Sequence, residues 1–202
     1  MIGANGIQWD DEPAYDTNST DITTAPPIFG PYHRFYFSQG YVYAPKPDEP
    51  YVPVSQPHLA VFITNGTGSS NSVAPGYIRP GEIEANNIAI RAFWFDAYSA
   101  FLGCDNAGPQ DCRMEFSGYT YTGFTDDEIL TYQQNVTIPA CPSQKGCQLQ
   151  QVEFPVVMRG LSGLQIRAFV GDEQRIWFMD NLALGWYDTS CAAGMKRAQV
   201  HG

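Results

Sequence analysis

The fold is decided by residues 175–186, which read RIWFMDNLALGW. Side chains of a β-strand alternate between its two faces, and this run predicts a strand. One face of that strand would carry Ile176, Phe178, Asp180, Leu182, Leu184 and Trp186. A carboxylate in an apolar row needs hydrogen-bond donors, a paired charge or a metal ion, because its removal from water is costly. Asp180 is therefore expected either to accept hydrogen bonds from a nearby turn or to bind a structural cation.

The start of the chain offers a second carboxylate of the same kind. In residues 7–11, IQWDD, alternation places Asp11 on the face of Ile7 and Trp9. The first and last strands of antiparallel sandwiches are often neighbours. We therefore predict that Asp11 and Asp180 hold one structural Ca²⁺ together with backbone carbonyl groups.

The rest of the chain reads as short strands separated by turn residues. Short apolar, aromatic and β-branched runs predict strands at 35–37, 41–43, 59–63, 88–100, 113–122 and 129–138, and clean alternation predicts strands at 152–158 and 164–170. The first two are expected to form a hairpin around residues 38–40, and no segment shows convincing helical periodicity. This pattern predicts an all-β fold, a single-domain antiparallel β-sandwich of jelly-roll type.

Length and composition predict the extent of the domain and of its irregular segments. The 202 residues suit one domain, 1–202, since sandwiches of this size are common as single units. Residues 12–31 are predicted to be a long Pro/Thr-rich loop, and residues 192–202 a flexible tail.

The cysteines and sequons indicate a secreted, extracellular protein. Two close pairs, Cys104 with Cys112 and Cys141 with Cys147, lack the CxxC spacing and nearby histidines of a zinc site and predict two disulfides. Cys191 is left without a partner. Three Asn-x-Ser/Thr triplets are candidate glycosylation sites, at Asn18, Asn65 and Asn135.

Charge and motifs exclude several classes of protein. A formal net charge of −10 without a Lys/Arg cluster opposes binding to nucleic acid, and no apolar run is long enough for membrane insertion. The nucleophile, zinc-protease, redox and dinucleotide motifs are absent. Paired carboxylates could still form a glycosidase site, although most acidic side chains are solvated surface. The acids available for such a pair are Asp48, Glu49, Glu82, Glu84, Asp126, Asp127, Glu128 and Glu153.

The aromatic residues are the stronger functional indication. Tyrosine combines a flat apolar ring with a hydroxyl group, which suits contact with sugar faces. Aromatic residues in strands also serve the core and cross-strand pairs, so both roles are open. Our candidates for an exposed ligand-binding platform are Tyr121 and Trp186.

Five motifs in fixed order carry a family resemblance. They are GIQWDD at 6–11, PYH at 31–33, PVS at 53–55, FWFDAYSAFLGC at 93–104 and RIWFMDNLALGW at 175–186. Together they resemble an uncharacterised C-terminal domain family of secreted fungal cell-surface, adhesin-like proteins, which has no established activity to carry over. The closing Phe-Met-Asp-Asn-Leu also resembles, more distantly, the last strand of galactose-binding-like and carbohydrate-binding-module jelly rolls. That resemblance implies a structural calcium at Asp180.

Three functions follow from these observations. The first is a non-catalytic binding or adhesion module of a secreted fungal cell-wall or cell-surface protein, with an extracellular glycan or a host or cell-wall surface as partner. The second is a polysaccharide-active enzyme with paired carboxylates. The third is a purely structural cap domain of a cell-wall glycoprotein.

Overall fold

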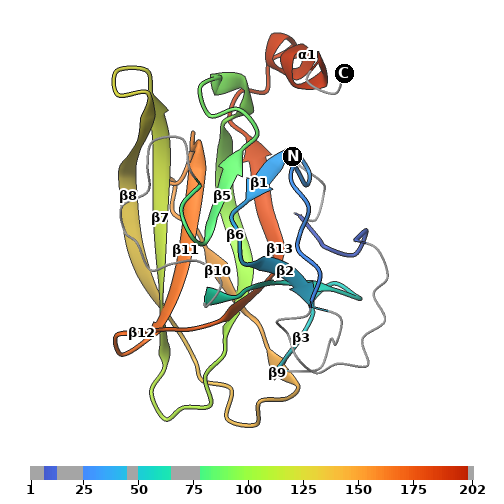
Figure 1. The fold of residues 1–202 in the computed structure, drawn as a ribbon, viewed down its shortest axis with the longest axis vertical. Helices are drawn as coiled ribbons and strands as arrows, with labels where there is room; N and C mark the ends of the chain where they lie inside the picture. Colours follow the sequence, from blue (N-terminus) through green and yellow to red (C-terminus); the bar gives the residue numbers. More distant parts are fainter. Residues whose placement is uncertain (1–6, 13–24, 45–49, 65–77, 200–202) are drawn as a thin grey trace.

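The computed structural model describes residues 7–12, 25–44, 50–64 and 78–199, and strands dominate it (Figure 1). The strands up to the first disulfide are β1 (Phe35–Phe37), β2 (Tyr41–Ala44), β3 (Tyr51–Val52), β4 (Leu59–Phe62), β5 (Glu82–Ala85) and β6 (Phe95–Cys104). The later strands are β7 (Cys112–Thr122), β8 (Asp127–Ile138), β9 (Cys147–Gln148), β10 (Gln150–Glu153), β11 (Gly163–Val170), β12 (Glu173–Gln174) and β13 (Trp177–Trp186). A 3₁₀ turn, η3 (Arg91–Phe93), and one helix, α1 (Cys191–Gln199), complete the described elements.

Two antiparallel sheets form the sandwich. The six-stranded sheet has the order β1-β5-β11-β7-β8, with β12 paired to β11, and in Figure 1 it runs from β8 at the left to β1 near the centre. The five-stranded sheet has the order β10-β6-β13-β4-β2, and a small parallel pair joins β3 to β9. The predicted all-β sandwich is confirmed, whereas the jelly-roll assignment stays a prediction.

The main core lies between the two sheets. In β11, Leu164, Ile166 and Ala168 are fully buried, while Gln165 and Arg167 alternate with them on the outer face. This alternation explains why the outer face of the six-stranded sheet is polar. A second apolar cluster lies around Val61 and Phe178 of the five-stranded sheet, together with Tyr51 of β3.

The predicted hairpin at 35–43 is wrong in its pairing. Both strands exist, but β1 pairs with β5 in the six-stranded sheet and β2 pairs with β4 in the five-stranded sheet. Residues 38–40 therefore form a corner between the two sheets. A hydrogen bond from the backbone N–H of Tyr41 to the carbonyl oxygen of Ser38, at 3.3 Å, closes this corner.

The last long strand has the predicted position but not the predicted alternation. Trp177 and Met179 lie in the main core, while Phe178 lies in the second cluster. The pairing with β6 shifts register between Asp180 and Ala183, and Asn181 has a positive φ of 47°. Beyond this bulge Leu182 enters the main core. A β-bulge exchanges the faces of the residues on its two sides, so the expected common face of Asp180 and Leu182 is wrong.

Two further predicted strands are too long, because turns interrupt them. The run at 88–100 contains η3, and β6 begins only at Phe95. The indole N–H of Trp94 donates to the carbonyl oxygen of Ile88 at 2.6 Å, which holds the turn before η3. The run at 152–158 ends with β10 at Glu153, and Val156 is 79% exposed because the chain turns after Pro155.

The expected flexible tail is largely a packed helix. Helix α1 covers Cys191–Gln199, and its residues Ala193 and Arg197 are buried. The Arg197 guanidinium donates to the carbonyl oxygens of Ala92 and Asp188 and lies 4.7 Å from the ring centre of Trp186. These contacts fasten α1 to the end of β13. Residues 200–202 lie outside the described residues.

The predicted cysteine pairing is confirmed. Cys104 is bonded to Cys112 and Cys141 to Cys147, and Cys191 is free and exposed. No helix in the described residues is long and apolar enough to cross a membrane.

Of the three sequons, only the one at Asn135 can be placed. Asn135 is exposed on β8, opposite Glu115 of β7. Asn18 and Asn65 lie outside the described residues, as does most of the predicted loop at 12–31.

Candidate functional site

The outer face of the six-stranded sheet brings together polar and aromatic side chains from distant parts of the sequence. The register across β1, β5, β11 and β7 aligns Tyr36, Glu84, Gly163 and Tyr119. Adjacent positions on these strands belong to the core, so alternation turns this row outward. Long-range strand pairing alone creates the row.

Two carboxyl groups, those of Glu82 and Glu128, lie together over Gly163. A Cβ atom at residue 163 would be 2.2 Å from Oε1 of Glu82 and 2.9 Å from Oε1 of Glu128, so glycine is required there. Arg79 bridges the pair: its Nη1 lies 3.2 Å from Oε1 of Glu82 and 2.8 Å from Oε2 of Glu128. The Ser162 hydroxyl also donates to Glu128. The two carboxyl groups are thus fully engaged with protein partners.

The cluster holds more carboxyl groups than cations, because Arg79 faces Glu82, Glu128 and, at 3.9 Å, Asp127. Burial raises the pKa of Glu82 well above its ordinary value, the charge of Glu128 raises it further, and Arg79 opposes both effects. A hydrogen bond with Glu128 also raises the pKa of Glu82, which favours a proton shared between the two carboxyl groups. With that proton in place, the Arg79 guanidinium faces the carboxylates of Glu128 and Asp127. The Arg79 guanidinium also lies 4.0 Å from the ring centre of Tyr119, which favours the cation.

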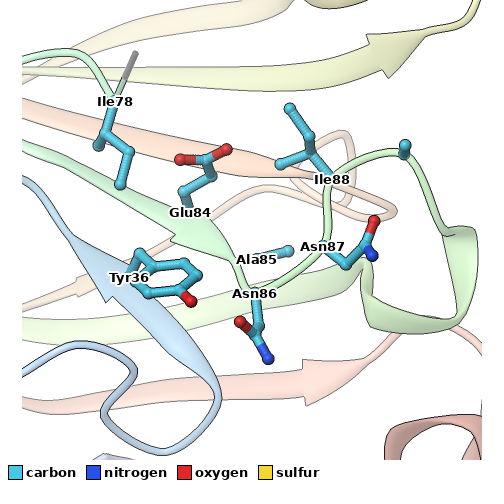
Figure 2. A pocket seen from close by; sticks show the side chains of 8 residues that line it. Tyr36, Ile78, Glu84, Ala85, Asn86, Asn87 and Ile88 are labelled. Carbon is cyan, nitrogen blue, oxygen red and sulfur yellow. The ribbon is translucent and has the colours of Figure 1, made fainter. Parts of the chain in front are cut away.

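An open hollow of about 440 Å³ lies beside this cluster, at the ends of β1 and β5 (Figure 2). Its lining residues are Tyr36, Ile78, Glu84, Ala85, Asn86, Asn87, Ile88 and Ala89. Its volume falls in the range of about 300–1,000 Å³ that small-molecule sites span. Figure 2 shows the Tyr36 ring, the Glu84 carboxyl and the two asparagine amides arranged around the end of β5. The hollow therefore offers one ring, one carboxyl and two amides between apolar walls.

Glu84 is the only one of the three carboxyl groups that lines the hollow. Burial raises the pKa of Glu84 to about 7, the charge of Glu128 adds to this effect, and Arg79 opposes it. Glu82 is fully buried and the Glu128 side chain is 4% exposed, so neither is available to a ligand. Reachable chemistry in the hollow therefore rests on a single carboxyl.

The two carboxylates predicted to hold calcium have separate protein partners. Asp180 is buried and accepts hydrogen bonds from the backbone N–H and the hydroxyl of Ser55, at 2.8 and 3.0 Å, and from the backbone N–H of Asn181 at 2.7 Å. These donors correspond to the turn interpretation of Asp180. Asp11 accepts a hydrogen bond from the Tyr32 hydroxyl, and its side chain is 63% exposed.

The segment that begins at Ile7 lies beside the last long strand, as predicted. Ile7 and Leu182 exchange backbone hydrogen bonds of 2.7 and 3.1 Å. The chain turns after Trp9, however, so that Glu12 rather than Asp11 points inward. Burial raises the pKa of Glu12 to about 7. Across the described ranges, no group of three or more His, Cys, Asp or Glu that could hold a metal ion is found, and the calcium site stays a prediction.

The two aromatic candidates lie in different environments. Tyr121 is half-buried on the outer face of β7, opposite Glu128, and its hydroxyl donates to Asp126. Trp186 stacks on Phe35 with ring centres 5.6 Å apart, and Arg197 covers it. Trp186 thus has contacts on its ring that hold the core and α1 together, whereas Tyr121 shares the sheet face of the hollow.

The sequence placed Tyr36 only in a general group of aromatic residues, gave no indication of Asn86 or Asn87, and offered Glu84 as one acid among eight. A signal for Glu82 and Glu84 was present, because Glu82-Ile83-Glu84-Ala85 alternates polar with apolar residues. That pattern places both glutamates on one face of a strand. It gives no information about Gly163 or Glu128, which come from strands much later in the chain.

The fold and the site define an antiparallel β-sandwich with an open polar hollow on one sheet face. Residues 1–197 match the family model described as Domain of unknown function (DUF7371), and the chain belongs to this family. A search of curated proteins finds no match.

Proposed function

We propose that this chain is a non-catalytic binding module of a secreted cell-surface protein, of the fungal adhesin-like type, and that it binds an extracellular glycan in the hollow beside Glu84. The observation that carries the proposal is the lining of the hollow, which combines the Tyr36 ring with the amides of Asn86 and Asn87. An aromatic ring packs against the apolar face of a sugar, while planar polar groups hydrogen-bond to its hydroxyls.

The carboxyl geometry favours binding over hydrolysis. A glycosidase needs two carboxyl groups that face the scissile bond from opposite sides, about 5 to 9.5 Å apart. Here Glu82 and Glu128 contact each other and Arg79, so their oxygens are not directed at a substrate. Glu84 alone lines the hollow. One carboxyl with a pKa of about 7 could exchange protons with a substrate, so polysaccharide cleavage is the alternative that an activity assay must test.

The setting of an extracellular protein is supported by the two disulfides, because such bonds persist in oxidising compartments. The net charge of −10 reduces non-specific adhesion to anionic membranes and nucleic acids. A shallow site of this size gives weak single-site affinity. Many copies on one surface would convert weak contacts into avidity.

The test is retention on a multivalent support. The domain, immobilised in many copies, is presented with cell-wall polysaccharides and host glycans, and soluble products are assayed in parallel. We expect retention without turnover, and about a tenfold loss of affinity in Tyr36→Ala, equivalent to ~1.4 kcal/mol. Tyr121→Ala is the matched control, because Tyr121 lies on the same sheet face but outside the hollow.

Each outcome separates the three functions. Retention lost in Tyr121→Ala but not in Tyr36→Ala would move the site along the sheet to the originally predicted tyrosine. Turnover that disappears in Glu84→Gln would establish the enzyme. The absence of retention on every surface would leave the structural cap domain as the better account.

A further inference from the structure

The Glu84 carboxyl lines the hollow without a protein partner. Within the described part of the chain, it has no hydrogen bond and no ion pair, although burial and the charge of Glu128 act against its ionised form. The nearby guanidinium of Arg79 is occupied by Glu82 and Glu128. A cation from outside the chain would stabilise the ionised form of this half-buried carboxyl group.

The surroundings of Glu84 favour a positively charged ligand. The Arg79 guanidinium behind it already faces Glu82, Glu128 and Asp127, so the charge of Glu84 is uncompensated in the hollow when that group is ionised. The protein as a whole has a net charge of −10, which attracts cations and repels anions. An anionic sugar would meet repulsion from both sources.

The remaining lining groups restrict the ligand further. The face of the Tyr36 ring attracts both cations and apolar C–H surfaces. The amides of Asn86 and Asn87 can each donate and accept, which matches neighbouring hydroxyl groups. Ile78 and Ile88 supply apolar walls. A ligand that satisfies all of these groups carries an ammonium group and several hydroxyls on one compact ring.

We propose that the hollow binds a protonated amino sugar and distinguishes an unacetylated hexosamine unit from its N-acetylated counterpart. The inference rests on the proposed glycan-binding function and names the class of glycan. The ammonium group pairs with the Glu84 carboxylate, and the asparagine amides hold the adjacent hydroxyls. N-acetylation removes the charge and leaves the carboxylate unpaired. A lysine side chain of a protein carries the same charge but no hydroxyls for the two amides.

The experiment compares two oligosaccharides by calorimetry at low salt. Glucosamine oligomers and N-acetylglucosamine oligomers of equal length and linkage are titrated into the wild-type domain and two variants. Glu84→Gln removes the carboxylate, and Asp172→Asn makes the same change of net charge at an exposed residue outside the hollow. We expect the wild type to prefer the glucosamine oligomer by about tenfold or more. The preference should fall below about threefold in Glu84→Gln and remain in Asp172→Asn.

The outcomes distinguish this inference from the proposed function. Equal affinity of the wild type for both oligomers would overturn the amino-sugar assignment and leave a neutral glycan site. A preference that survives in Glu84→Gln, with thermal unfolding showing that the variant is folded, would also overturn it. Tighter binding of a lysine-rich peptide than of the glucosamine oligomer would identify a protein partner instead. No binding of either oligomer, or of any glycan on the multivalent support, would refute the proposed function itself.

Discussion

An alanine at position 163 would place its Cβ atom 2.2 Å from Oε1 of Glu82 and 2.9 Å from Oε1 of Glu128. Neither neighbour can move easily. Glu82 is fully buried, and both carboxyl groups are tied to Arg79. The backbone of Gly163 cannot shift either, because β11 is paired on one side with β5 and on the other with β7. The substitution must therefore disrupt the carboxyl pair or distort the sheet.

Two effects determine the loss of stability in Gly163→Ala, and both act on the Glu82 and Glu128 carboxyl groups. Overpacking of a close-packed interior costs about 1–3 kcal/mol. Separating a buried, hydrogen-bonded charge cluster costs about 3–5 kcal/mol. Since the two effects share the same atoms they do not add fully, and we expect Gly163→Ala to reduce the free energy of unfolding by about 3–5 kcal/mol.

Urea unfolding followed by tryptophan fluorescence measures this change as a lower midpoint with an unchanged slope. The matched control is Gly123→Ala, since nothing lies within 4 Å of a Cβ atom at that position. The control should change the free energy of unfolding by no more than about 0.5 kcal/mol. A Gly163→Ala variant as stable as the control would refute the packing of Glu82 and Glu128 over Gly163.

Three further predictions concern pH, the helix and calcium. The pKa of Glu82 is raised in the folded state, so its stabilising contribution is complete below the unfolded pKa of about 4.5 and is lost as pH rises towards the folded value. The urea midpoint of the wild type should therefore decrease from pH 5 to pH 8. The decrease should be smaller in Glu82→Gln. A midpoint that rises over this range would contradict the shared proton. Arg197→Ala leaves two backbone carbonyl groups without their donor and should cost about 1–3 kcal/mol in thermal unfolding, whereas Lys196→Ala, an exposed neighbour, should stay within about 0.5 kcal/mol. A calcium ion held by Asp11 and Asp180 would make the melting temperature fall with chelator and recover with added calcium, while an unchanged melting temperature would assign Asp180 to its turn alone.

Local patterns were sufficient to predict most strands but not their partners. The patterns in residues 113–122, 129–138 and 164–170 correctly predict β7, β8 and β11, because β7 and β11 bury one face in the core and β8 packs Tyr132, Val136 and Ile138 against it. Nothing local indicates that β1 and β2 belong to different sheets. Strand pairing depends on contacts between distant segments, which one sequence does not reveal.

The largest errors came from single residues that interrupt a regular pattern. The bulge at Asn181, with its positive φ, reverses the faces of β13 and places Asp180 beside Ser55 rather than beside Leu182. Helix α1 was not predicted because it is short and mostly exposed. It is fixed through Arg197, a charged residue that periodicity analysis assigns to the surface.

The candidate site could not be predicted from local sequence patterns, because it also depends on the pairing of distant strands. Glu84 and Tyr36 are ordinary residues in sequence, and they meet only because β1 pairs with β5. Gly163 is recognisable as a required glycine only once the positions of Glu82 and Glu128 are known. A sequence can supply such residues as candidates, but the pairing of four strands selects among them.

The hydrogen bonds between Ile7 and Leu182 have a consequence for how the chain folds during synthesis. Ile7 and Trp9 are almost completely buried, and the main-chain partner of Ile7 belongs to the last long strand, β13. A ribosome makes residues 7–9 long before that partner emerges. Two large apolar side chains therefore stay exposed until nearly the whole domain has been translated, which slows folding and favours binding by chaperones in the meantime.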